Sequence, residues 1–245
     1  MTRLLELADV VARRAGLAVA ETPGWRDRGH GEMALPRCVV VHHTAGAAGG
    51  DAPSLATVIG GRPDLAGPLA HLLVARTGTV HVVAAGLCWH TGATREPWQA
   101  NAYAVGIECE HTGDEADPWP PAQLDAMRRL CTALCGHYGI PHARVLAHRE
   151  ICEPPGRKID PAGIDMRAFR AALAATEEDA MALSDTDIDR IAAAVWRYAI
   201  RNAFGDDVQA QQILNGTEQR TAEILDAANL LIERTSVRWE VAAPS

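Results

Sequence analysis

The sequence lacks three features that each mark a particular class of protein. It contains no apolar stretch of the ~18–20 residues that cross a bilayer. Its amino-terminal segment places Arg and Glu among the apolar side chains, unlike a secretory signal. It also contains no cluster of Lys and Arg, and its formal net charge is −8, which does not suit a phosphate backbone. We therefore expect no membrane insertion, no signal peptide and no binding to nucleic acid.

The composition is that of a folded globular chain. Hydrophobic residues make up 48% and charged residues 22% of the 245 residues, close to the averages of ~45–50% and ~25% for soluble domains. The six cysteines are expected to be reduced in a chain that stays in the cytosol. We interpret Cys109, Cys131 and Cys135, which lie in apolar patterns, as small core residues.

Five segments have the composition of β-strands. The β-branched run at 38–42 predicts a strand that is buried on both faces and opens into a loop. The segments 70–76 and 79–84 predict a hairpin around a tight turn. Two further strands are expected over 103–110 and 145–148.

Apolar residues at helical spacing predict three helices in the same part of the chain, over 3–14, 121–138 and 165–175. Pro121 suits the first position of the second helix, and Gly139 suits its end. Because strands and helices interleave, we expect an α/β fold with a mixed central β-sheet flanked by helices.

The pattern changes after residue 175. The acidic stretch 176–184 predicts a linker, and apolar positions at helical spacing predict a small helical region over 185–245. Two amphipathic helices cannot bury their apolar stripes alone. We therefore expect this region to pack on the first domain, 1–175, or to form a homo-oligomer with other copies of the chain.

Three residues at expected strand ends have side chains that bind metals: His42, His148 and Asp160. A catalytic zinc site uses three such ligands and leaves a fourth position open. Adjacent residues on a strand point to opposite faces, so His42 and His43 cannot both bind one metal unless the strand has already ended. The alternative for each histidine is an ordinary structural role.

Six motifs in order carry a resemblance that covers about residues 37 to 170: V-V-H-H-T-A-G, A-H-L-L-V-x-x-x-G-x-V, W-H-T-G, V-G-I-E-x-E, H-R-E and R-K-x-D-P. The chain resembles the zinc-dependent N-acetylmuramoyl-L-alanine amidases of type 2. This superfamily also includes peptidoglycan recognition proteins and many phage endolysins. The resemblance implies the same mixed α/β fold.

The resemblance implies one zinc ion per chain, bound by His42, His148 and Asp160. Many relatives have Cys at the third ligand position, whereas Asp there resembles muropeptide-recycling amidases and a set of actinobacterial phage lysins. Cys152 is the rival third ligand because its sulfur is softer, although the family pattern has no ligand at that position.

The resemblance also implies the catalytic groups. Glu108 matches the general base and acid, and Lys158 matches the lysine that faces the substrate carbonyl. Other members use a Tyr where this chain has Ala70, which increases the weight on Glu108. Glu110 lies on the same strand face, where we expect a solvated charge at the strand end.

Three further residues match positions around the family's site. His90 and Asn101 resemble residues that line the groove for the sugar and the stem peptide, and His71 resembles a buried histidine that supports the site. The alternative for each of the three is a purely structural role.

The favoured function is a peptidoglycan hydrolase, an endolysin that cleaves the amide bond between N-acetylmuramic acid and L-alanine with a zinc-activated water. The alternatives are a cytosolic muropeptide-recycling amidase and a non-catalytic peptidoglycan-binding protein, which would typically lack a zinc ligand. The region after residue 185 favours the lysin, and the composition suits a phage of an actinobacterial host. Such a lysin would wait in the host cytoplasm and act on the cell wall after release. Recognition of a neutral wall glycan is the alternative to oligomerisation for residues 185–245.

Overall fold

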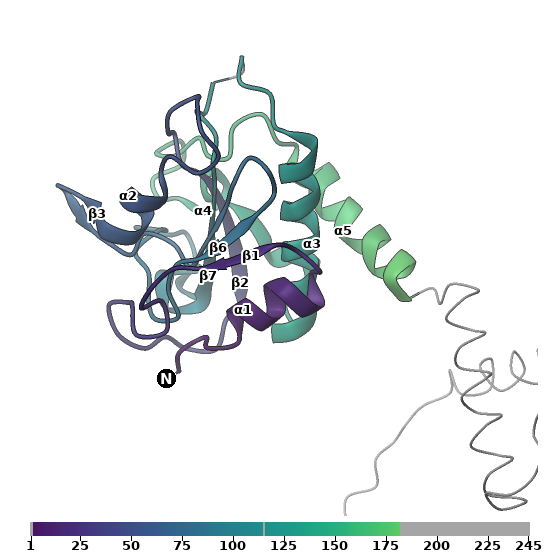
Figure 1. The fold of residues 1–245 in the computed structure, drawn as a ribbon, viewed down its shortest axis with the longest axis horizontal. Coiled ribbons are helices and arrows are strands. Elements are labelled where there is room, and N and C mark those ends of the chain that lie inside the picture. Colours follow the sequence, from purple (N-terminus) through teal and green to yellow (C-terminus); the bar gives the residue numbers. More distant parts are fainter. Residues whose placement is uncertain (1, 115, 182–245) are drawn as a thin grey trace, which may run out of the picture. The chain divides into compact units, whose positions relative to one another are not determined.

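The computed structural model describes residues 2–114 and 116–181, which contain a mixed α/β fold (Figure 1). Their main sheet has the strand order β1-β6-β5-β7-β2-β8. Only the β5–β6 pair is antiparallel, and the other pairs are parallel. The strands are β1 Val19–Glu21, β2 Cys38–His43, β5 Leu72–Val74, β6 Val80–Val82, β7 Ala104–Cys109 and β8 Val145–Ala147. The expected α/β class and central sheet are confirmed.

The helices lie on both faces of this sheet. A short element formed by α1 and a π-helical turn packs with α3 and α5 against one face, and α2 and α4 belong to the opposite face. Their bounds are α1 Leu7–Asp9, the π-helix Val10–Arg14, α2 Leu55–Gly60, α3 Pro121–Tyr138, α4 His148–Ile151 and α5 Met166–Met181. Three 3-10 turns cover Pro97–Gln99, Asn101–Tyr103 and His142–Arg144.

The helix α3 forms for reasons that are visible in its sequence. Pro121 occupies its first turn, where a missing backbone N–H costs nothing. Gly139 ends it with φ of 66°, a left-handed conformation that glycine adopts without strain. Its buried face includes Cys131 and Cys135, which join Cys109 in the main core. The interpretation of these three cysteines as core residues is confirmed.

Alternation along β2 and β7 divides their side chains between the two faces. Val39 and Val41 belong to the core beneath α3, whereas Val40 belongs to a separate cluster on the other face. Because β2 and β7 are parallel with His42 opposite Glu108, these two side chains leave the sheet on the same face. His43 lies on the opposite face, where its Nδ1 accepts a hydrogen bond from the backbone N–H of Ala162. The two adjacent histidines therefore serve different sites.

Several observed elements differ from the expected ones. The hairpin of β5 and β6 is confirmed with shorter strands, whereas β1, α2 and a separate hairpin of β3 (Gly61–Arg62) and β4 (Leu65–Ala66) carry no clear sequence signal. Helix α5 continues to Met181, past the expected domain end at residue 175. The rest of the expected linker 176–184 and the helical region 185–245 lie outside the described residues. No helix within the described part of the chain combines the length and apolar character that crossing a membrane requires.

Candidate metal centre

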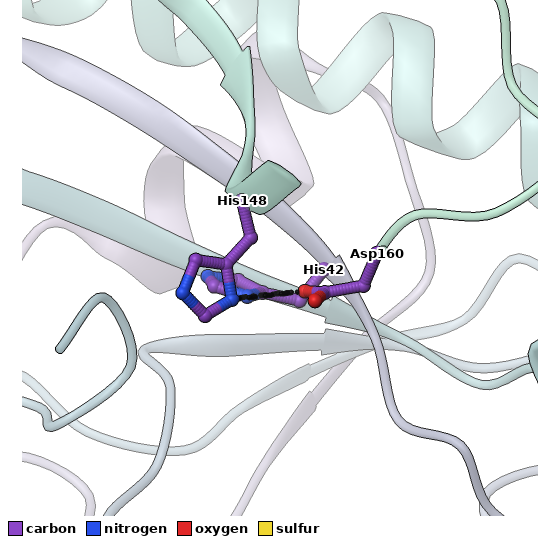
Figure 2. A group of neighbouring side chains, drawn as sticks. All are labelled: His42, His148 and Asp160. Carbon is purple, nitrogen blue, oxygen red and sulfur yellow. Dashed lines mark hydrogen bonds and ion pairs between the residues drawn. The ribbon is translucent and has the colours of Figure 1, made fainter. Parts of the chain in front are cut away.

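The carboxyl ends of neighbouring parallel strands bring the candidate ligands together (Figure 2). His42 lies near the end of β2, and His148 follows β8 directly as the first residue of α4. Asp160 comes from the loop after α4. His42 Nδ1 lies 3.0 Å from His148 Nδ1, and Asp160 Oδ2 lies 2.9 Å from the first and 3.1 Å from the second. Three potential ligand atoms therefore converge on one point.

A hydrogen bond on its far side fixes the tautomer of His148. Its Nε2 lies 2.9 Å from the carbonyl oxygen of Thr91. A carbonyl oxygen only accepts hydrogen bonds, so Nε2 must bear the proton. With that proton on Nε2, a neutral ring would present the lone pair of Nδ1 to the cluster, which is the form that binds a metal.

A chain of two hydrogen bonds fixes the tautomer of His42 in the same way. His90 Nε2 lies 3.3 Å from the carbonyl oxygen of Ala104 and must donate to it, so His90 Nδ1 accepts. His42 Nε2, which lies 3.0 Å from His90 Nδ1, is therefore the donor. Burial lowers the pKa of His42 to about 4, so its ring is neutral at pH 7 and its Nδ1 offers a second lone pair.

The third group is a carboxylate. Burial by itself would raise the pKa of the Asp160 carboxyl, but its contacts with His148 and His42 outweigh burial and lower that pKa below its usual range. With a proton on the far nitrogen of each ring, these three atoms are all acceptors, and they lie 2.9–3.1 Å apart. Their lone pairs would repel one another, and a cation bound between them would offset this repulsion.

The donor set fits zinc. Zinc binds imidazole nitrogen and carboxylate oxygen at about 2.0–2.2 Å, which places tetrahedral ligands about 3.3–3.6 Å apart. The observed separations are slightly shorter than that. Within residues 2–114 and 116–181, these side chains form the one group of three or more potential ligands. Cys152, the rival ligand, is outside the group, and its buried thiol contacts the carbonyl oxygen of Arg149 at 3.7 Å.

Glu108 lies beside this cluster on the neighbouring strand. Its side chain is half-buried, and its Oε2 is buried without a hydrogen-bond partner in the described structure. Burial, followed by the negative charge of Asp160, raises the pKa of Glu108 well above its usual range, and the positive charge of Lys158 opposes this effect. A raised pKa brings the protonated and ionised forms of a carboxyl closer in free energy, which suits a group that accepts and later releases a proton.

Lys158 is the only lysine in the chain. It is half-buried, and its charge acts to lower the pKa of both His42 and Glu108. The ammonium group is therefore close enough to the cluster to influence it electrostatically.

The three remaining candidates lie behind His42. His90 is buried against the His42 ring, and Asn101 contacts the backbone of His90 and Thr91. His71 is fully buried, and its Nδ1 accepts a hydrogen bond of 3.0 Å from the backbone N–H of Gly106. These contacts are structural and lie around the cluster. Direct contact of His90, Asn101 or His71 with substrate stays a prediction.

Glu110 contradicts the expectation of a solvated charge, because its side chain is fully buried. Its Oε1 accepts hydrogen bonds of 2.8 Å from the hydroxyls of Thr44 and Ser54, and its Oε2 accepts one of 2.9 Å from the backbone N–H of Ser54. Loop residues between β2 and α2 therefore fold over this carboxylate. The sequence around Glu110 gives no indication of this burial, because its hydrogen-bond partners are far away in the chain. The signal that could have been used is the pair of hydroxyl residues in the loop, which supply the donors.

We expect Glu110→Ala to destabilise the protein by about 1–3 kcal/mol, because it removes a buried carboxylate and leaves partly buried donors of Thr44 and Ser54 without that acceptor. Urea denaturation measures the change in the free energy of unfolding. Glu32→Ala, at an exposed position, is the matched control and should stay within about 0.5 kcal/mol of the parent. Equal stability of the two variants would contradict a structural role for Glu110.

Comparison with known proteins supplies a family for this geometry. No curated protein matches the chain. Similar solved structures include a selenomethionine derivative of AmpD, at 24% identity over 64% of this chain and 93% of that chain, with a TM-score of 0.47. Another is the endolysin amidase LysCS of Clostridium intestinale, at 19% identity over 64% and 95%, with a TM-score of 0.47.

A third is the amidase AmiD of E. coli in complex with the substrate anhydro-N-acetylmuramic acid-L-Ala-D-gamma-Glu-L-Lys, at 25% identity over 60% of each chain, with a TM-score of 0.47. The stronger finding is a family match over residues 32–163, more than half of the chain. This range includes His42, His148 and Asp160. The chain therefore belongs to the N-acetylmuramoyl-L-alanine amidase family.

Proposed function

We propose that this chain is a zinc-dependent peptidoglycan hydrolase that cleaves the amide bond between N-acetylmuramic acid and L-alanine. The observation that carries the proposal is the convergence of three acceptor atoms, from His42, His148 and Asp160, within 2.9–3.1 Å of one another. Hydrogen bonds on the far side of both imidazoles support the metal-binding tautomers. One zinc ion per chain would satisfy all three acceptors.

When bound there, zinc supplies Lewis-acid chemistry, which lowers the pKa of a water molecule and polarises a carbonyl group. Glu108 would accept a proton from the attacking water and deliver it to the departing amine of L-alanine. Lys158 would stabilise the negative charge that develops on the lactyl carbonyl oxygen. Hydrolysis of an amide needs an activated nucleophile, a proton donor and a stabilised oxyanion, because an amide is a poor electrophile with a poor leaving group.

Two biological settings use this reaction. We favour an endolysin of an actinobacterial phage, which would stay in the host cytoplasm until release and then act on the intact wall. The residues that follow the matched range support this setting, since a recycling enzyme needs little beyond a catalytic domain.

We also propose the division into a catalytic domain 1–175, a linker 176–184 and a helical region 185–245 that forms homo-oligomers. Light scattering of the full chain measures the oligomeric state.

The test of the function is product analysis on purified cell walls. An amidase of this kind releases new amino termini of L-alanine and creates no new reducing sugar ends. Release of reducing ends would indicate a glycosidase, and release of neither product would indicate a binding protein. Comparing intact actinobacterial walls with soluble anhydro-muropeptides then separates the lysin, which should prefer walls, from a recycling enzyme.

A further inference from the structure

One short loop contacts both histidines of the metal cluster on their far sides. His90 Nδ1 lies 3.0 Å from His42 Nε2, and the carbonyl oxygen of Thr91 lies 2.9 Å from His148 Nε2. Each of these contacts selects the tautomer that presents an Nδ1 lone pair to the cluster. The position of residues 90 and 91 therefore determines whether two of the three ligands are ready to bind.

One side-chain oxygen accepts three hydrogen bonds from this loop, and Arg157 Nη2 donates a further one of 3.0 Å to the carbonyl oxygen of Thr91. Asn101 Oδ1 accepts hydrogen bonds from the backbone N–H of His90 at 2.9 Å, from the backbone N–H of Thr91 at 2.8 Å and from the Thr91 hydroxyl at 3.0 Å. Thr91 is fully buried, so water cannot easily replace these bonds. Asn101 begins the 3-10 turn that leads directly into β7. Its side chain thus ties the loop to the strand that carries Glu108.

We propose that Asn101 is a positioning residue for metal binding, which acts through His90 and Thr91 on the tautomers of both metal-binding histidines. This inference rests on the proposed function, in which the cluster binds zinc. Without the Asn101 oxygen, three donors lose their common acceptor and the loop can shift. In a shifted loop, the contacts that hold a proton on Nε2 of His42 and His148 are lost. The proton can then move to Nδ1 of either ring, where it takes the place of the lone pair that would bind the metal.

We expect removal of the Asn101 oxygen to lower the affinity for zinc by more than the loss of an equivalent buried hydrogen bond elsewhere in the fold would. Changes to groups that orient metal ligands typically cost about 10-fold to 100-fold in affinity. We expect a loss in this range for Asn101→Ala. Asn101→Asp keeps an oxygen acceptor at the same place and should recover most of the affinity.

The experiment measures zinc dissociation constants of the full chain by competition with a chromophoric chelator, together with the absorption spectrum of the cobalt-substituted protein. Gln99→Ala is the matched control. Gln99 is also a buried amide, and its Oε1 accepts a hydrogen bond of 3.1 Å from the backbone N–H of Glu96, in the turn just before Asn101. The control should lower the melting temperature without changing zinc affinity or the cobalt spectrum.

Two results are distinguishable failures. If the parent chain does not bind zinc, the proposed function fails and this inference fails with it. If the parent binds zinc and Asn101→Ala has the same affinity as Gln99→Ala, only the inference about Asn101 is overturned. Should Asn101→Ala not fold, Thr91→Val repeats the test with a smaller change, because it removes one of the three bonds and retains the backbone carbonyl. A lowered zinc affinity supports the inference, and an unchanged one overturns it.

Discussion

Asp160→Ala is expected to remove both zinc binding and amidase activity. The substitution leaves two neutral imidazoles in place of a set of three ligands that includes the only negative charge. A bound metal ion contributes several kcal/mol to transition-state stabilisation, and each 1.36 kcal/mol is worth a factor of ten in rate. We therefore expect kcat/KM to fall by at least about 10³-fold. Elemental analysis should give one zinc per chain in the parent and little in the variant.

Two matched variants separate a ligand role from a structural one. Asp160→Cys should retain zinc, because thiolate is also a zinc ligand. Asp165→Ala changes an exposed carboxylate that caps α5 through the backbone N–H groups of Arg167 and Ala168. It should cost about 1 kcal/mol of stability and leave zinc and activity unchanged. Full zinc content in Asp160→Ala would show that this carboxylate is not a ligand.

Glu108→Gln is expected to lower kcat by about 10²–10⁴-fold, the range that general acid–base catalysis supplies, while zinc content stays at one per chain. The amide has the shape of the carboxyl but cannot accept or release a proton at neutral pH. Steady-state kinetics on a soluble muropeptide and elemental analysis of the same sample measure the two quantities. Loss of zinc together with activity would instead place Glu108 among the metal ligands.

The pH dependence gives a second readout for Glu108. Burial raises the pKa of this carboxyl well above its usual range, and the group must be deprotonated to accept a proton. The activity of the parent should therefore fall as the pH is lowered through that raised pKa. This acid limb should be absent from the residual activity of Glu108→Gln. An identical pH profile in both proteins would assign the limb to another group.

The sequence predicts the part of the site that depends on strand alternation. A buried β-branched strand followed by two histidines implies that only one of them faces a given site, and the structure places His42 with Glu108 and His43 on the other face. The central strands and α3 were predictable for a similar reason, since their apolar pattern extends over enough residues to be recognised. These features depend on local patterns that the chain carries within a few residues.

The features that could not be predicted depend on contacts between distant residues. Glu110 looks like a charge at a strand end, and only the loop with Thr44 and Ser54 makes it a buried acceptor. The contact of Asn101 with His90 and Thr91 is similar, because ten or eleven positions separate the partners. The short strands β1, β3 and β4 carry too few residues for a period to be recognised.

The central claim is that amidase activity requires one zinc ion at the cluster of His42, His148 and Asp160. Its most direct measurement is amidase activity on purified walls after exhaustive chelation, followed by titration with zinc. We predict that the metal-free chain releases no L-alanine amino termini and that activity returns in full at one equivalent of zinc. Undiminished activity in a chain proven free of metal would contradict the account.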